Sequence, residues 1–228
     1  MSEEQPWIPI ESDPEIMTKL IQSLTDSGSY LIDVPIIDGA EEMGLFTDHN
    51  VVAFIFLYTI NEKTENNFVG EMLNGCPKDL FHMKQVNKNA CGTVALFHAF
   101  LNNKSQSAAD SSIMEQFYKK AAPEDYLNRG RIFSEMSKIK ELHENYACFG
   151  QSNLPNNEEL NNVAYHYVAF IPYNGFVYEL DGRRPYPIKH LECQSKSFIS
   201  AGLSSIQALI NRDPDNYNFA ILAFCNPA

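Results

Sequence analysis

The hydrophobic pattern of the first part of the chain predicts one helix and two strands. Apolar residues recur at helical spacing over residues 13–24, behind a capping box made by Ser12 and Glu15. Residues 30–34 form a short strand pattern, and residues 51–60 are a continuous β-branched and aromatic run. Such a run, too short for a long helix, indicates a fully buried strand.

A second helix is predicted over residues 89–101, with Asn89 as its N-cap. Almost every position in it is apolar, and a helix that is apolar all round is a buried one. We therefore expect this helix to pass through the centre of the domain. Residues 111–121 and 123–146 are predicted as exposed helices with charged faces, the second of them broken near Gly130.

The pattern is lost over residues 147–163, which carry Gly150, Pro155 and five Asn residues. A stretch of this length without structure is uncommon inside a compact domain and is usually functional or disordered. Two strands follow, over residues 165–173 and 176–181, joined by Asn174-Gly175, the strongest short-range hairpin signal. An amphipathic helix over 198–211 and a buried strand over 217–225 complete one α+β domain spanning residues 1–228.

Composition narrows the class of protein. The 228 residues are 44% hydrophobic and carry a net charge of −12, with the 17 basic residues scattered, so neither nucleic acid nor an anionic membrane is an expected partner. The charge serves solubility or attracts a basic partner. The longest apolar run is about half a membrane span, and the first six residues are too polar for a signal peptide. Five irregularly spaced cysteines argue against a disulfide framework or a structural zinc site, and favour a reducing, cytoplasmic location.

Cys91 is the candidate nucleophile. It lies in the first turn of the predicted buried helix, where the helix dipole and free N–H groups favour a thiolate. The neighbouring Gly92 leaves little bulk over the sulfur. The alternative is a structural role, because cysteine is among the most buried residue types. The other four cysteines are left as structural or surface residues.

The predicted hairpin supplies a candidate base. A two-residue turn at 174–175 sets Val168 opposite Asp181, and alternation of side chains puts His166 on the same face. His166 and Asp181 are then diagonal neighbours, roughly 7 Å apart at Cβ, a separation that the two side chains can span. A His–Asp pair beside a cysteine at a helix start suits nucleophilic thiol catalysis. The alternative is a satisfied core pair without a catalytic task.

The remaining histidines compete poorly as the base. His98 is two helical turns from Cys91, His49 and His82 lie in loops, and His143 lies on an exposed helix. His190 is kept as a reserve candidate. Gln85, six residues before Cys91, is a candidate oxyanion donor through its side-chain amide, together with the backbone N–H of Cys91.

Several blocks of the sequence resemble the ubiquitin C-terminal hydrolase family. Residues 85–93 (QVNKNACGT) resemble its active-site block, 178–183 (YELDGR) its aspartate block and 165–167 (YHY) its histidine segment. Residues 7–14 and 213–219 are similar to its first and last segments. The resemblance implies a papain-like cysteine-peptidase fold, with a central antiparallel sheet flanked by helices, a knotted backbone, and residues 147–163 as an active-site crossover loop.

The same resemblance assigns roles to individual residues. Gln85 becomes the oxyanion donor, Cys91 the nucleophile, His166 the base and acid, and Asp181 the residue that orients His166. The substrate contacts that it implies are Pro9, Ile10, Gly150, Gln151, Asn216 and Phe219.

The function that the resemblance implies is a deubiquitinating thiol hydrolase. It would act as a monomer, release small adducts or short peptides from the C-terminal glycine of ubiquitin through a thioester, and need no metal or cofactor. One alternative is a ubiquitin-binding protein that stabilises free ubiquitin with little turnover. Another is a hydrolase that acts on the tail of a ubiquitin-like protein.

Overall fold

The computed structural model describes residues 5–103, 108–149, 156–194 and 197–227. In this part of the chain, seven strands form one sheet in the order β1-β7-β2-β4-β5-β6-β3, and every neighbouring pair is antiparallel. The strands are β1 (Tyr30–Asp33), β2 (Asn50–Thr59), β3 (Glu71–Met72), β4 (Tyr165–Tyr173), β5 (Phe176–Leu180), β6 (Ile188–Glu192) and β7 (Ala220–Asn226).

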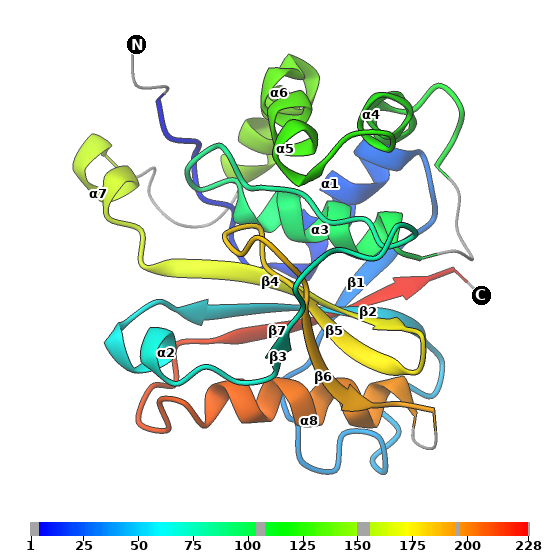
Figure 1. Ribbon diagram of the computed structural model, residues 1–228, viewed down its shortest axis with the longest axis vertical. Helices are drawn as coiled ribbons and strands as arrows, with labels where there is room; N and C mark the ends of the chain where they lie inside the picture. Colours follow the sequence, from blue (N-terminus) through cyan, green and yellow to red (C-terminus); the bar gives the residue numbers. More distant parts are fainter. Residues whose placement is uncertain (1–4, 104–107, 150–155, 195–196, 228) are drawn as a thin grey trace.

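Helices cover both faces of the sheet, as Figure 1 shows. The helix α3 lies on one face with α1, α4, α5 and α6 around it, and α8 lies on the other face (Figure 1). The predicted α+β architecture, with an antiparallel sheet flanked by helices, is confirmed. The helices are α1 (Pro14–Thr25), α2 (Glu62–Asn66), α3 (Cys91–Leu101), α4 (Ile113–Ala121), α5 (Tyr126–Glu135), α6 (Ser137–Ala147), α7 (Asn157–Asn161) and α8 (Phe198–Ile210).

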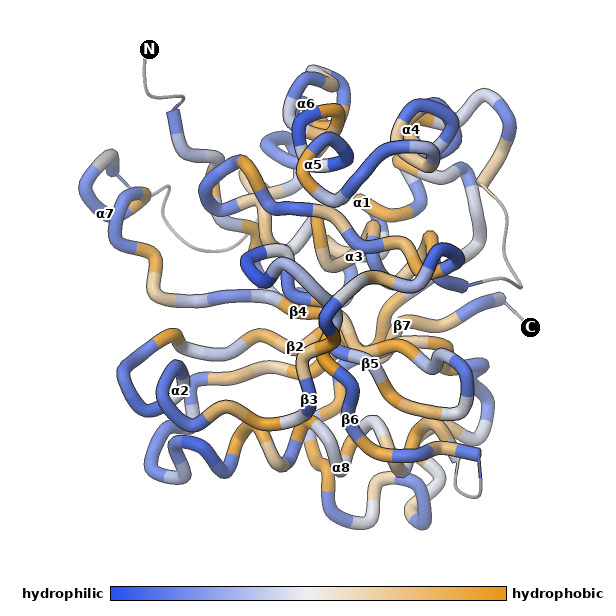
Figure 2. The backbone as a smooth tube through the Cα atoms, in the orientation of Figure 1, coloured by the Kyte–Doolittle hydropathy of each residue, from blue (hydrophilic) through white to orange (hydrophobic). Residues whose placement is uncertain are grey.

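The sheet separates two apolar clusters, because side chains alternate along each strand. Ala53 and Ile55 of β2 belong to the cluster on the α3 side, and Phe54 and Phe56 to the cluster beneath α8. Figure 2 shows the central strands mostly in hydrophobic colours, and the peripheral helices α2 and α7 mostly in hydrophilic ones. The helix α3 is buried at every position from Cys91 to Phe100, as its sequence predicts.

Two predicted helix starts are wrong in detail. The N-cap of α1 is Asp13, whose side chain accepts a hydrogen bond from the Ile16 N–H, so Ser12 makes no capping box. The N-cap of α3 is Ala90, without a side-chain cap. Asn89 instead has a φ of +66°, a conformation that asparagine tolerates better than most residues.

The helix predicted over residues 123–146 is broken at Met136, between α5 and α6, and not at Gly130. Gly130 instead lies where α5 packs closely against the backbone of Lys84. A Cβ atom there would lie 2.2 Å from the carbonyl oxygen of Lys84, so only glycine allows α5 to approach that segment so closely.

Short elements appear where the sequence predicted none. Within the predicted loop, α7 is started by a capping box between Asn156 and Glu159. The helix α2 begins with a similar box at Asn61, and β3 and β6 extend the sheet at one edge. The last strand, predicted from residue 217, begins at Ala220, and Tyr217 is 82% exposed ahead of it.

Among the described residues, no helix has the length and apolar character needed to cross a membrane.

Candidate active site

Cys91 lies at the first position of α3, in contact with β4. The residue is 7% exposed, and its thiol lies close enough to the His166 ring and to the backbone N–H groups of Tyr167 and Gly92 for them to stabilise the thiolate. The uncapped helix start leaves its N–H groups free to face the sulfur. Burial alone raises a thiol pKa, but the bond and charge of His166 outweigh it, so the pKa of Cys91 lies below its ordinary value.

His166 and Asp181 form the pair that the hairpin register predicts. Tyr173 lies opposite Phe176 and Ala169 opposite Leu180, which is the expected register. The ladder ends there, one pair before Val168 and Asp181. The His166 Nε2 atom lies 2.6 Å from Asp181 Oδ1, with both side chains buried, which leaves Nδ1 to face the thiol.

Each member of this pair stabilises the charged form of the other. Burial lowers the pKa of a histidine, but the Asp181 carboxylate and Cys91 raise the pKa of His166 to about 9. Burial likewise opposes the charge of Asp181, yet His166 and Arg183 hold its pKa well below the usual range. Asp181 Oδ1 accepts the Arg183 N–H at 2.8 Å, and the Arg183 Nε atom lies 3.4 Å from Oδ2. The two shifts, a lowered pKa for Cys91 and a raised one for His166, both favour the charged forms of the thiol and the ring, an arrangement suited to attack a carbonyl carbon.

Gln85 is near this site, but among the described residues its side-chain amide bonds a backbone carbonyl and not Cys91. The Gln85 backbone N–H donates to the Gly182 carbonyl at 2.9 Å, and its side-chain amide donates to the Asn87 carbonyl at 3.2 Å. Its Oε1 atom is buried without a hydrogen-bond partner among the described residues. The role of Gln85 as an oxyanion donor stays a prediction.

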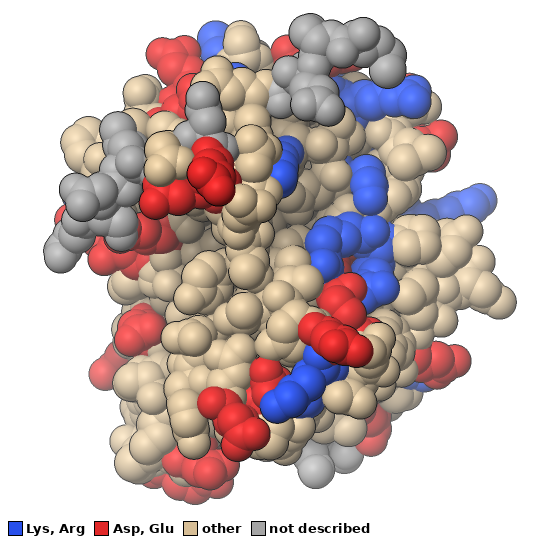
Figure 3. Space-filling model, turned by 90° about the vertical axis from the view of Figure 1, so that its left-hand side faces the viewer, with Lys and Arg blue, Asp and Glu red and all other residues tan. Residues whose placement is uncertain are grey.

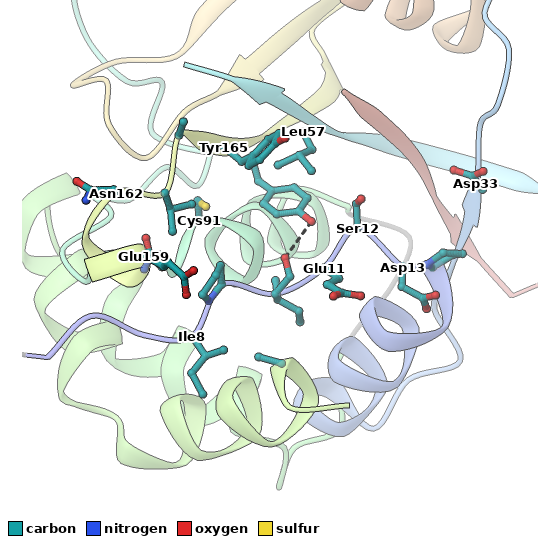
Figure 4. A pocket seen from close by; sticks show the side chains of 18 residues that line it. Ile8, Glu11, Ser12, Asp13, Asp33, Leu57, Cys91, Glu159, Asn162 and Tyr165 are labelled. Carbon is teal, nitrogen blue, oxygen red and sulfur yellow. Dashed lines mark hydrogen bonds between the residues drawn. The ribbon is translucent and has the colours of Figure 1, made fainter. Parts of the chain in front are cut away.

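A groove of about 840 Å³ opens beside Cys91 and is lined by residues 8–14, by the segment after α7 and by β4. Figure 4 places the Cys91 sulfur near Glu159 and Asn162, with Glu11 and Asp13 farther along the groove. Pro9 and Ile10 line this groove, as expected of substrate contacts.

The other predicted contacts lie elsewhere. Asn216 and Phe219 line a separate, smaller depression beneath the start of β7. Phe219 is 36% exposed there. Gly150 and Gln151 lie outside the described residues.

Three side chains that sequence reasoning did not select hold the N-terminal wall of the groove. The Asn89 amide donates to the carbonyls of Trp7 and Leu160, at 3.0 and 2.8 Å. His143 Nε2 donates to the Ile8 carbonyl at 2.6 Å while its Nδ1 accepts from Thr93. The Tyr167 hydroxyl donates to the Ile10 carbonyl at 3.2 Å.

His143, predicted on an exposed helix, lies in α6, but its own side chain is fully buried. Burial lowers its pKa to about 4, so it is neutral in this position. The reserve candidate His190 is not in contact with Cys91. It pairs with Glu179 at 2.9 Å, and both side chains are buried at the edge of a different pocket. In the described ranges, no three His, Cys, Asp or Glu side chains gather in a way that could hold a metal ion.

Comparisons with known proteins identify the family that the chain resembles. The family model described as ubiquitin carboxyl-terminal hydrolase, family 1 (peptidase C12), matches residues 7–211. A ubiquitin carboxyl-terminal hydrolase of Drosophila melanogaster is 35% identical over 224 residues, covering 95% of this chain and 96% of its own. One of Aplysia californica is 30% identical over 217 residues, covering 94% of this chain and 100% of its own.

A solved structure shares the fold. The Trichinella spiralis UCH37 catalytic domain, crystallised with ubiquitin vinyl methyl ester, matches with a TM-score of 0.79 over 98% of this chain and 97% of that one, at 23% identity. The similarity at that identity concerns the fold alone. With a buried Cys–His–Asp site on this fold and a family match over nearly its whole length, the chain belongs to the ubiquitin carboxyl-terminal hydrolases of family 1, which are cysteine peptidases.

Proposed function

We propose that this chain is a deubiquitinating thiol hydrolase that releases small adducts or short peptides from the C-terminal glycine of ubiquitin. The observation that carries the proposal is the assembled Cys91–His166–Asp181 site, whose pKa shifts favour a charged thiolate–imidazolium pair before any substrate binds. The family relationship supports ubiquitin as the substrate. One domain spanning residues 1–228 would act as a monomer, without a cofactor.

The reaction proceeds in two acyl-transfer steps. The Cys91 thiolate attacks the carbonyl carbon of the terminal glycine, a C–S bond forms, and the carbonyl oxygen becomes an oxyanion. The amide N–H of Gln85 and the backbone N–H of Cys91 stabilise this oxyanion. As the C–N bond breaks, His166 gives its proton to the leaving amine, which leaves a thioester.

Hydrolysis then restores the enzyme. The neutral His166 takes a proton from water, whose oxygen attacks the thioester carbonyl. The C–S bond breaks, ubiquitin leaves with a free carboxyl group that gives its proton to solvent, and Cys91 returns as a thiolate beside protonated His166. Asp181 holds the ring in position and stabilises its charge through both steps.

The groove beside Cys91 fits an extended, basic tail. Its rim carries the carboxylates of Glu11, Asp13, Asp33 and Glu159. On the face shown in Figure 3, acidic side chains gather on the left and basic ones lie in a band right of the centre, so the net charge of −12 is unevenly spread. Complementary charge of this kind favours fast association and correct register. Pro9 and Ile10 would contact the tail in this groove. Gly150, Gln151, Asn216 and Phe219 stay proposed contacts with ubiquitin, Asn216 and Phe219 through the separate depression that they line.

Two alternatives remain distinct in their chemistry. A ubiquitin-binding protein with little turnover has no need of a thiolate–imidazolium pair, and the pair at Cys91 therefore favours the enzyme. A hydrolase for a ubiquitin-like tail would share the whole mechanism and differ only in the groove.

Covalent trapping tests the proposal. Ubiquitin carrying a C-terminal vinyl methyl ester, whose activated alkene adds a thiolate without a leaving group, should form a 1:1 adduct on Cys91, located by peptide mass. Ubiquitin-like proteins carrying the same group should react far more slowly. Ubiquitin that binds without forming an adduct would favour the binding protein. Preferential trapping by a ubiquitin-like protein would favour the second alternative.

A further inference from the structure

Two segments that are far apart in the sequence run side by side behind the catalytic pair. Residues 82–85, before α3, and residues 181–183, after β5, are joined by hydrogen bonds of 2.9 to 3.4 Å. The Gln85 N–H donates to the Gly182 carbonyl, and the Lys84 ammonium to the Arg183 carbonyl. These segments carry two proposed catalytic side chains, those of Gln85 and Asp181.

The backbone of Asp181 is fixed from outside the sheet. The ladder between β4 and β5 ends at the Ala169–Leu180 pair, so Asp181 is the first residue beyond it. Its carbonyl accepts the Arg184 N–H, which closes a turn, and the ring of His82, whose Nε2 atom lies 3.1 Å away. A carbonyl only accepts, so the His82 Nε2 atom carries the proton.

His82 is held rigidly and uses only one of its two nitrogens. Its side chain is fully buried between the rings of His98 and Tyr126, at centroid distances of 5.1 and 4.9 Å. The Nδ1 atom has no hydrogen-bond partner among the described residues. Burying an unpaired polar atom is costly, so an apolar ring would suit this place better if packing were its only task.

We propose that His82 is a positioning residue, whose Nε2–H holds the Asp181 backbone beyond the end of β5 so that the carboxylate meets His166 at bonding distance. The inference rests on the proposed catalytic role of Asp181. Tyr126 supports the same arrangement, since its hydroxyl donates to the Gly182 carbonyl at 2.9 Å.

The charged and titratable groups around both rings are few. His98, Tyr126, Arg129, Lys84 and Asp181 surround His82, and burial lowers its pKa to about 4, so it is a neutral donor at physiological pH. The titratable groups Asp181, Cys91 and Tyr58 lie around His166. If the Asp181 carboxylate were displaced, the first effect would be a weaker positive charge on His166. The second would be a less stable Cys91 thiolate, because His166 supports it.

The test compares three variants with the wild type. His82→Phe keeps a ring between His98 and Tyr126 but removes the donor. His82→Gln replaces the imidazole with an amide N–H. His49→Leu is a matched control, because His49 bonds the Tyr30 hydroxyl on a distant loop before β2. Steady-state release of a fluorophore from ubiquitin gives kcat and KM, and alkylation of Cys91 by iodoacetamide, followed by peptide mass across pH, needs no ubiquitin.

We expect His82→Phe to lower kcat by roughly 10- to 100-fold with KM changed little, since small displacements of a catalytic group cost rates of this order. Alkylation of Cys91 should require a higher pH, because His166 loses part of its charge. His82→Gln should recover most of both properties, and His49→Leu should match the wild type. If His82→Phe does not fold, the smaller His82→Leu takes its place.

Wild-type kcat and an unchanged alkylation profile in His82→Phe would overturn the proposal, as would a folded His82→Gln variant that loses as much as His82→Phe. The two readouts also separate this inference from the proposed function. A wild type that releases no fluorophore, with an alkylation profile that still shifts in His82→Phe, would refute ubiquitin as substrate and support the role of His82.

Discussion

Replacing Asp181 with Asn removes a single charge from the centre of the site and leaves the size and shape of the side chain almost unchanged. The Asp181 carboxylate and Cys91 together raise the pKa of His166 from an ordinary 6.5 to about 9, against burial. That difference corresponds to about 3 kcal/mol in favour of the charged ring. Both side chains are almost completely buried, so little of this energy is screened by solvent.

We expect Asp181→Asn to lower kcat for a ubiquitin amide by up to about 100-fold, because Asp181 is the larger of the two sources of the ~3 kcal/mol that supports the imidazolium, which equals roughly two decades of rate. KM should change little, since the groove is lined by other residues. The alkaline limb of the pH–rate profile, expected near pH 9 where His166 loses its proton, should move toward 6.5. Arg183 keeps its ion pair with Glu65 at 2.8 Å, which limits the loss of folding stability.

Fluorophore release from ubiquitin, measured from pH 5 to 10, provides the assay. Asp26→Asn is a matched control, because Asp26 is exposed at the end of α1 with a φ of +52° that asparagine adopts readily. A kcat within threefold of the wild type in Asp181→Asn, or an alkaline limb that does not move, would refute this view of the pair.

Three further predictions concern the surroundings of the site. Gly130→Ala should lower the free energy of unfolding by about 1–3 kcal/mol, because its Cβ would meet the Lys84 carbonyl; an unchanged urea midpoint would contradict this. Asn89→Gly keeps the positive φ without strain but loses two hydrogen bonds to the groove wall. The free energy of unfolding should fall by about 1–3 kcal/mol, and KM should rise more than kcat falls; an unaltered KM would count against this prediction. His82 and His143 both have a pKa of about 4, so between pH 6.5 and 4 the folded protein binds fewer protons than the unfolded chain. The free energy of unfolding should therefore fall as pH drops through that window, by roughly 3 kcal/mol for each histidine. Urea midpoints at pH 7 and 4.5 test this, and equal midpoints would be inconsistent with two buried neutral histidines.

The His166–Asp181 pair was predictable because its geometry depends on local rules. The Asn174-Gly175 turn sets the register of β4 and β5, and that register places His166 near Asp181. The buried helix α3 was likewise visible from its lack of a polar face. Neither conclusion required knowledge of contacts between distant segments.

The parts that sequence reasoning missed depend on contacts between distant segments. His82 bonds a carbonyl 99 residues away, and His143 bonds one 135 residues away, so neither appears in a local pattern. Asn89 looked like a helix cap because asparagine is common there, whereas its amide bridges Trp7 and Leu160. Gly130 has the sequence signature of a helix breaker, whereas in the structure it allows the Lys84 backbone to approach α5, a contact that the local pattern does not show.

Release of a fluorophore from the C-terminus of ubiquitin, by the wild type and by Cys91→Ala side by side, tests the central claim most directly. We predict rapid release by the wild type and none above background by Cys91→Ala, with ubiquitin still bound by the variant. Release that survives in Cys91→Ala would contradict the assignment of the nucleophile, and no release by a folded wild type would contradict the proposed activity.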